Sequence, residues 1–512
     1  MPTYTKRKSK LHLQLTNSDH ASAHGGQVLV DALCRRFDLW QRIQKEPSLD
    51  PRQRQNVGFT PAANIAQLLF ALTSGGASLA DAERIGQDQV LMNLLGLATG
   101  ADQTTLGEWL RAQTKESVQA LHQINAQLVD WSISQAKPAR WLHAGQAEVF
   151  FDDSQIEVLG HKFEGARLNH EGNRALGWQT LWLGPWLLDG ILDGAGDVSE
   201  HLPELLQAHQ PRWKDRPNYL YADSGSSAAK YLNRIEQAGF DRWSVSYNKW
   251  TDKLDRLAAE LPDSQWSPLP AAAQPQEQYA WVKHQPGECE RVQKFAAVRW
   301  KKEADLMWRY AYAVGQPGEK DTPQGVFERH RLKGAKEQGF SEVLSGLDLH
   351  HPPCSDLIAN QAFYAIAMLA YNLLISLKVL DLPDEAQSWR IQTMIRQLLT
   401  LPVTVSTHAR YNVARICIPA GGLRWWRLFV DRWIPKRKSG RPVMEVVDSA
   451  RPAVKSPQSN SPSKTRWPQR ARVGHASRAL STFFPKQTRN SPKALGANLK
   501  RTFQIPNSSI FW

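Results

Sequence analysis

The chain has 512 residues, of which 42% are hydrophobic and 22% charged, a balance that fits a soluble globular protein of roughly two to four domains. Its four cysteines form no CxxC pair, which argues against a zinc site or a disulfide framework and fits a reducing cytoplasm. The basic cluster near the first residue is followed by no apolar segment, so we expect no secretory signal.

The formal net charge of +14 indicates a polyanionic partner, but the charge is unevenly distributed. Between Lys436 and Trp512 lie 16 of the 63 Lys and Arg residues and only 2 of the 49 Asp and Glu residues. The preceding 435 residues therefore hold 47 basic and 47 acidic side chains. Any affinity of the main body for a polyanion must come from local patches.

Residues 1–140 are predicted to be helical. Thr60 followed by Pro61 is typical of a helix start, and Gly75-Gly76 ends that helix. Thr105 to Glu108 predicts a capping box that opens another helix. Short helices joined by small-residue turns fit a helix-turn-helix DNA-binding unit, and they fit an ordinary helical bundle equally well.

From residue 147 onward, β-branched and aromatic residues predict strands. Strands first, then a strand–helix–strand unit, indicate an α/β domain with a mixed sheet. Three tryptophans recur here at every fourth position and are expected in the core: Trp178, Trp182 and Trp186. The predicted strands are residues 147–159, 176–188, 189–192, 218–223 and 243–247, with a helix at 228–237.

Residues 251–318 interrupt this pattern with a Pro/Ala/Gln-rich loop and two strand-like runs, 279–283 and 308–314, which predict an inserted β-rich subdomain. Helix resumes at Thr322. The uncharged segment 357–377 is long enough to cross a bilayer, but it contains two asparagines and a glutamine, so we expect a buried core helix and no membrane partner. The predicted domains are a helical N-terminal domain (1–140), the first part of an α/β core (141–250), the insertion (251–318), the C-terminal helices of the core (319–434) and a basic disordered tail (435–512).

Acidic residues end two of the apolar strands. Asp152 and Asp153 follow Val149 to Phe151, and Asp223 follows Tyr219 to Ala222. Open α/β sheets bind their ligands at the carboxyl ends of the strands. Adjacent strand residues face opposite sides, so only one of Asp152 and Asp153 can point into such a site, and the following Ser154 favours Asp153.

Glu337 is a third acidic candidate, because it lies three residues before Phe340 on the apolar stripe of a predicted helix. Asp153, Asp223 and Glu337 would repel one another unless a cation lay between them. Oxygen ligands alone favour Mg²⁺ or Mn²⁺, and two such ions can support phosphodiester cleavage. Taken singly, each acid is more typical of a strand-end cap or a solvated helix flank.

Five segments stand out together: residues 150–154 (FFDDS), 220–225 (LYADSG), 330–337 (HRLKGAKE), 359–361 (ANQ) and 369–373 (LAYNL). They resemble the DDE transposases of bacterial insertion sequences, in the cut-and-paste branch that carries a β-rich insertion before the catalytic glutamate. The resemblance implies a ribonuclease-H-like core, with Asp153, Asp223 and Glu337 as the catalytic and metal-binding residues and with two Mg²⁺ or Mn²⁺ ions as cofactors.

The sequence departs from the family pattern at three places around the glutamate. His330 stands in the place of a tyrosine, Lys333 in the place of an arginine, and Leu344 in the place of a lysine. The resemblance implies that His330 and Lys333 contact DNA phosphates, and a lysine would replace a bidentate grip by a point charge.

In the insertion, basic residues make a candidate strip for phosphate contacts, with a solvated face as the alternative. The aromatic residues Trp281, Trp300 and Trp308 fit core packing, and a role in stacking a flipped DNA base is the alternative. The strip consists of Arg291, Lys294, Arg299, Lys301 and Lys302.

The resemblance implies a DNA transposase that binds transposon-end inverted repeats and catalyses metal-dependent cleavage and strand transfer. Its partners would be double-stranded repeat and target DNA and a second copy of the chain in a homodimer. Its location would be the bacterial cytoplasm, at the nucleoid. A catalytically decayed DNA-binding remnant is the alternative.

Overall fold

The computed structural model describes residues 20–53, 58–248, 250–268, 276–301, 305, 307–408 and 411–433, and within these ranges a few side chains, that of Glu337 among them, are not described. The described residues belong to one compact unit that extends to Val447. The basic tail predicted from residue 435 lies outside them, as does Lys302.

The N-terminal region is helical, as predicted. Thr60 caps α3 by accepting a hydrogen bond from the Ala63 amide, and Pro61 is the first helical residue. The helices are α1 (Gln27–Phe37), α2 (Leu39–Gln44), α3 (Pro61–Thr73), α4 (Leu79–Gln87), α5 (Gln89–Leu95), α6 (Gln103–Arg111) and α7 (Lys115–Gln135), with short 3₁₀ turns at Pro47–Leu49 and Pro138–Arg140.

The capping box predicted at Thr105 is wrong. Helix α6 begins at Gln103, because Asp102 is its N-cap and accepts a hydrogen bond from the Thr105 amide at 2.7 Å. A capping box does open the next helix, α7, where Thr114 and Ser117 bond reciprocally. Two candidate caps lie within one turn of each other in the sequence, so the local pattern alone could not choose between them.

A nine-stranded mixed sheet forms the core. Its strand order is β3-β4-β2-β6-β7-β10-β9-β8, with β5 paired to β4; β2, β6 and β7 run parallel and the other pairs antiparallel. The predicted α/β class with a mixed sheet is confirmed. The strands are β2 (Ala147–Glu157), β3 (Arg167–Leu168), β4 (Arg174–Leu183), β5 (Trp186–Gly194), β6 (Asn218–Ala222), β7 (Arg242–Tyr247), β8 (Gln276–His284), β9 (Gln293–Lys301) and β10 (Arg309–Gln316).

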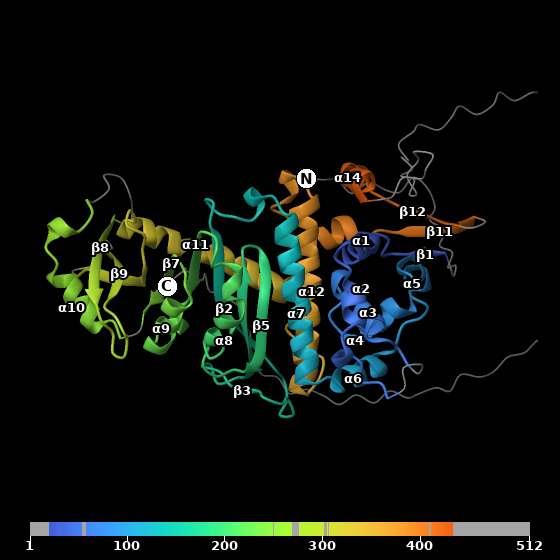
Figure 1. Cartoon of the computed structure of the whole chain (residues 1–512), viewed down its shortest axis with the longest axis horizontal. Helices are drawn as coiled ribbons and strands as arrows, with labels where there is room; N and C mark the ends of the chain where they lie inside the picture. The colour runs from blue at the N-terminus through green and yellow to red at the C-terminus, as the bar shows by residue number, and fades with distance from the viewer. Residues whose placement is uncertain are drawn as a thin grey trace, which may run out of the picture. The chain divides into compact units, whose positions relative to one another are not determined.

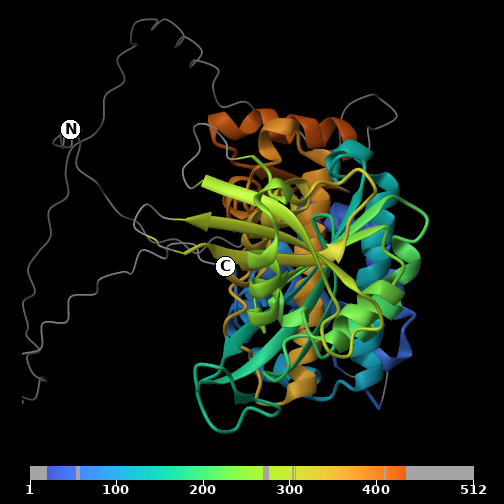
Figure 2. The same ribbon diagram turned by 90° about the vertical axis from the view of Figure 1, so that its left-hand side faces the viewer.

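The strands of the predicted insertion continue this sheet. β10 pairs with β7 through Val314 and Val245, and β9 and β8 follow outward. The sequence predicted two of these strands but not β9. Figure 2, which views the molecule from the left-hand side of Figure 1, shows these yellow-green strands rotated relative to the teal strands, as sheet twist requires.

The remaining helices flank the sheet. They are α8 (Leu202–His209), α9 (Ala229–Gln237), α10 (Asp252–Glu260), α11 (Pro323–Gly346), α12 (Leu357–Asp381), α13 (Ile391–Met394) and α14 (Leu423–Trp433), with a π-helical turn at Ile395–Leu399 and 3₁₀ turns at Gln210–Arg212, Ser224–Ser226, Asp263–Gln265, Asp384–Ala386 and Ala420–Gly422. A small separate sheet joins β1 (Ala21–Ser22), β11 (Val403–His408) and β12 (Tyr411–Ile416).

Helix α12 is the apolar helix that the sequence predicted to be buried. It is the one described helix that is long and apolar enough to cross a membrane, and most of it is buried inside the protein. It lies beside α7 (Figure 1) and contacts α1, α3, α6 and β5. Its Tyr364 and Tyr371 pack edge-on against Trp178 and Trp182. The expected core role of these tryptophans is confirmed, and α12 joins the N-terminal helices to the sheet in one hydrophobic core.

Candidate active site

Asp152 and Asp223 lie at neighbouring positions of adjacent parallel strands. In the register of β2 and β6, Phe150 pairs with Tyr221 and Phe151 with Ala222, so Asp152 and Asp223 are the next pair. Asp223 retains an extended backbone (φ −85°, ψ 174°), so the strand geometry continues through it. Neighbouring strands are about 4.8 Å apart, which brings the two acidic residues side by side.

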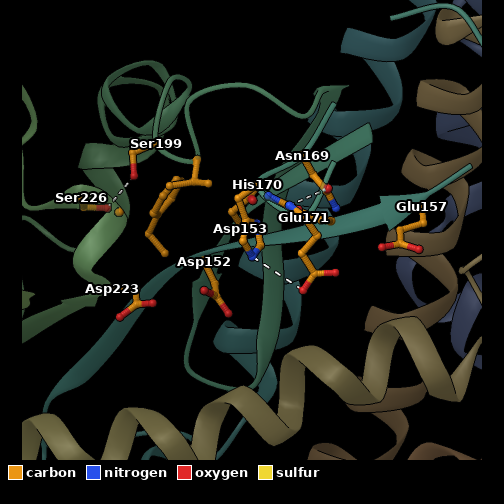
Figure 3. A pocket seen from close by; sticks show the side chains of 13 residues that line it. Asp152, Asp153, Glu157, Asn169, His170, Glu171, Ser199, Asp223 and Ser226 are labelled. Carbon is orange, nitrogen blue, oxygen red and sulfur yellow. Dashed lines mark hydrogen bonds and ion pairs between the residues drawn. The ribbon is translucent and has the colours of Figure 1, made fainter. Parts of the chain in front are cut away.

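Both of these aspartates face helix α11. Side chains alternate along a strand, so Asp152 shares a face with Phe150, and Asp223 shares a face with Tyr221. Phe150 and Tyr221 stack with their centroids 4.8 Å apart, and the Tyr221 hydroxyl accepts a hydrogen bond from Arg329 Nε of α11 at 2.6 Å. Figure 3 shows Asp152 and Asp223 next to each other, turned toward the ribbon of α11.

Asp153, the residue that the sequence favoured, lies on the opposite face of the sheet. One of its carboxylate oxygens lies 3.2 Å from the position that a Cβ on Gly177 would take. Burial raises the pKa of Asp153 to about 7, and the nearby charges of Asp152 and Asp197 act in the same direction. The geometry therefore favours Asp152 over Asp153 as the partner of Asp223.

A cavity of about 430 Å³ opens at these strand ends. Asp152, Asp153 and Asp223 line it together with Asn169, His170 and Glu171, polar residues of a turn that the sequence gave no reason to select. In that turn, between β3 and β4, the Asn169 side chain accepts hydrogen bonds from the Glu171 and Asn173 amides. The further lining residues are Phe151, Gln155, Glu157, Val198, Ser199, Gly225 and Ser226.

Steric contacts explain why a glycine, Gly225, follows Asp223 and Ser224. A Cβ on Gly225 would lie 2.3 Å from Cγ2 of Val198, far inside van der Waals contact. Gly225 thus allows the turn after Asp223 to pack against the loop that follows β5, beside the hydrogen bond between Ser199 and Ser226 at 2.9 Å. The glycine of the Asp-Ser-Gly motif is therefore required by the packing of the turn that follows Asp223.

Helix α11 brings Lys333 to the aspartates. Lys333 is buried, and its Nζ lies 3.7 Å from Asp223 Oδ1. Glu337 follows Lys333 by four residues, so the two positions share one face of α11, about one turn apart. The Glu337 side chain is outside the described part of the structure, and its place in the site is inferred from this helix register. Leu344, which stands where a lysine would be in the family pattern, is buried.

His330 is buried against β7 instead of facing a ligand. Its Nδ1 and Nε2 lie 2.8 and 2.7 Å from the hydroxyls of Ser244 and Ser246. Burial lowers the pKa of His330 to about 4, and Lys333 contributes in the same direction. The imidazole is therefore neutral at pH 7 and holds α11 on the sheet, an arrangement that does not support the phosphate contact implied for it.

This lowered pKa predicts acid sensitivity. In the unfolded chain, the His330 side chain would bind a proton below its ordinary pKa of about 6.5. In the folded protein it binds that proton only near pH 4, so acid favours the unfolded state. The contribution of neutral His330 is thus fully present above about pH 6.5 and falls as the pH drops toward 4. We expect His330→Gln to flatten this part of the pH profile of the melting temperature. An unchanged profile would contradict the assignment.

The basic residues predicted in the insertion have separate environments. Arg299 is buried; its guanidinium bonds to Asp263 at 2.7 Å and to Gln278, and it lies 4.4 and 4.5 Å from the ring centroids of Trp266 and Trp308. A phosphate contact through Arg299 is therefore not supported. Lys301 is half-buried, with Nζ 5.1 Å from the Trp308 ring.

The donor set at the strand ends fits a hard divalent cation. Asp152 and Asp223 supply carboxylate oxygens side by side, and two like charges at this spacing favour a cation between them. Among the residues whose side chains are described, no three His, Cys, Asp or Glu converge on a metal position, and Glu337 is not in that set. The residues present are those that an oxygen-ligated Mg²⁺ or Mn²⁺ would use.

Residues 5–420 match the protein family described as Transposase DDE domain group 1, which covers the helical region, the sheet and α11 with its glutamate. No curated protein matches the chain. Enzymes of this family generally use divalent metal ions. The match spans most of the sequence and agrees with acidic residues at the ends of neighbouring strands beneath a helix, and the chain belongs to the DDE-domain transposases.

Proposed function

We propose that the chain binds the inverted repeats at the ends of its transposable element and catalyses metal-dependent DNA cleavage and strand transfer through Asp152, Asp223 and Glu337. The observation that carries this proposal is the pairing of Asp152 with Asp223 at adjacent strand ends, on the sheet face that α11 covers. This set replaces Asp153 by Asp152. The bacterial setting and a location at the nucleoid are part of the same proposal.

The chemistry consists of two phosphoryl transfers. In the first, water attacks a phosphodiester at the element end, the bond from phosphorus to the 3′-oxygen breaks, and a 3′-hydroxyl and a 5′-phosphate result. In the second, that 3′-hydroxyl attacks a target phosphodiester and releases a target 3′-hydroxyl. Two Mg²⁺ or Mn²⁺ ions, when bound, would activate the nucleophile and stabilise the leaving oxygen.

The residues of the chain have distinct tasks in this scheme. Asp152, Asp223 and Glu337 would hold the ions, and Lys333, 3.7 Å from Asp223, would offset part of their negative charge and meet the DNA phosphate. The N-terminal helices (1–140) would bind the repeats, and the tail (435–512) would add nonspecific affinity. Joining two ends requires two sites, which favours a homodimer in the active complex.

The test is a nicking assay on DNA that carries the inverted repeats flanking the gene, with and without Mg²⁺ or Mn²⁺. We expect metal-dependent nicks at the repeat ends, lost in Glu337→Gln and retained in Glu328→Gln. Glu328 is a matched control because it is an exposed glutamate of the same helix that bonds to Gln324. Repeat-specific binding without cleavage by either metal would instead identify a catalytically decayed DNA-binding remnant.

A further inference from the structure

A second cavity, of about 350 Å³, follows the C-terminal half of α11. Its walls are mostly small residues, and a Cβ on Gly334 would meet no atom within 4 Å, so the space above that residue is open. It lies between α11 and the segment that enters α13. The lining residues are Gly334, Ser341, Glu342, Ser345, Gly346, Arg390 and Gln392.

The cavity passes the position of the proposed catalytic glutamate. Gly334 precedes Glu337 by three residues and Ser341 follows it by four, so both are neighbours of residue 337 on the helix surface. Gly334 also follows Lys333, which contacts Asp223. The cavity therefore runs along α11 from Gly334, past the position of Glu337, to Gly346.

Two hydrogen bonds fix the segment that carries Arg390. The Glu342 carboxylate accepts a hydrogen bond from the Ile391 amide, and Gln392 Nε2 donates to the Ser345 carbonyl at 3.1 Å. These contacts hold the chain immediately after Arg390 against α11. The side chain of Arg390 is exposed and forms no ion pair with any residue that the structure describes.

We infer that this cavity binds a backbone phosphate of the DNA, with Arg390 as its cation. The guanidinium can bond to two phosphate oxygens at once, and the exposed hydroxyls of Ser341 and Ser345 supply further donors. Glu342 keeps its negative charge while it accepts the hydrogen bond from the Ile391 amide, and its electrostatic attraction to Lys378 offsets part of that charge. The inference rests on the proposed function for the identity of the ligand, and it adds a DNA contact outside the metal-binding residues.

The test measures binding of a short duplex carrying the terminal repeat, without added metal, over roughly 50 to 200 mM salt. Losing one phosphate contact lowers the slope of log K against log salt by about 0.9. We expect that fall for Arg390→Gln and no change for Arg396→Gln, an exposed arginine that does not line the cavity. Arg390→Lys should keep the slope and bind more weakly, because a lysine keeps the charge but loses the bidentate geometry.

Ser345→Trp is a second test that changes no charge. It should fill the cavity and lower the slope by the same amount as Arg390→Gln, with thermal melting to establish that each variant is folded. Equal slopes for wild type and Arg390→Gln, or equal falls for Arg390→Gln and Arg396→Gln, would overturn the inference. A wild-type protein that binds the repeat but cuts no DNA would refute the proposed catalysis, while the slopes would still decide the role of Arg390.

Discussion

Replacing Asp152 by asparagine is expected to lower the rate of metal-dependent nicking by on the order of 10³-fold, the effect of losing about 4 kcal/mol of transition-state stabilisation. Asparagine keeps the shape of the side chain but removes the negative charge that a divalent cation needs. Asp152 is the register neighbour of Asp223 and shares its sheet face, so the asparagine removes one of the two adjacent carboxylates at these strand ends.

Asp153→Asn is the matched control, since it makes the same chemical change one residue along. We expect the nicking rate to stay within several-fold of wild type. Asp153 lies on the other face, and burial raises its pKa to about 7, which makes its carboxyl a poorer source of the negative charge that a cation needs. Initial rates should be compared for folded proteins of matched circular dichroism. An inactive Asp153→Asn beside an active Asp152→Asn would mean that the face assignment is wrong.

The aspartates at these strand ends differ in how far the sequence could predict their positions. The place of Asp223 at the end of a strand was predictable, because the residues before it are apolar and an Asp-Ser-Gly turn follows. The choice between Asp152 and Asp153 was not, because β2 is buried on both faces and the residues before both aspartates are apolar. Only the register with β6 and the position of α11 decide it, and both depend on contacts between residues far apart in the chain.

The strands of the insertion were also only partly predictable from the sequence, because their pairing depends on contacts between distant residues. β9 was not predicted because its charged residues, such as Lys294 and Arg299, indicated a solvent-facing strip. In the structure β9 is paired on both sides, and Arg299 is buried through its bonds to Asp263 and Gln278. The pairing of β10 with β7 joins residues more than sixty positions apart, for example Tyr312 and Tyr247, and no local pattern specifies it.

Asp189 is a buried charge that the sequence did not single out, because its partners come from distant helices. It lies on β5, and its two carboxylate oxygens lie 2.5 Å from His122 Nδ1 of α7 and 2.5 Å from His209 Nε2 of α8. Arg212 NH1 lies 2.8 Å from His209 Nδ1 and, being only a donor, assigns the His209 proton to Nε2. The carboxylate thus links an N-terminal helix, the sheet and α8.

Asp189→Asn is expected to lower the free energy of unfolding by about 3 kcal/mol, because an amide can accept a hydrogen bond at only one end and leaves one of the two histidines at this buried position unmatched. Asp193→Asn is the control: Asp193 lies on the same strand, is more exposed, and its carboxylate is 3.4 Å from His201. A half-exposed pair of this kind contributes about 0.5 kcal/mol. Urea denaturation of both variants at pH 7 measures the difference, and equal losses would contradict a special role for Asp189.

The pH dependence of that loss gives an independent check. Burial alone would raise the pKa of Asp189, but His122 and His209 together hold it far below its usual range. A carboxylate whose pKa is lowered in the folded state stabilises that state above its ordinary pKa of about 3.9, and this contribution is lost as the pH falls below that value. The difference in unfolding free energy between wild type and Asp189→Asn should therefore shrink as the pH falls below about 4. A difference that persists unchanged into acid would show that the loss comes from altered packing and not from the charge.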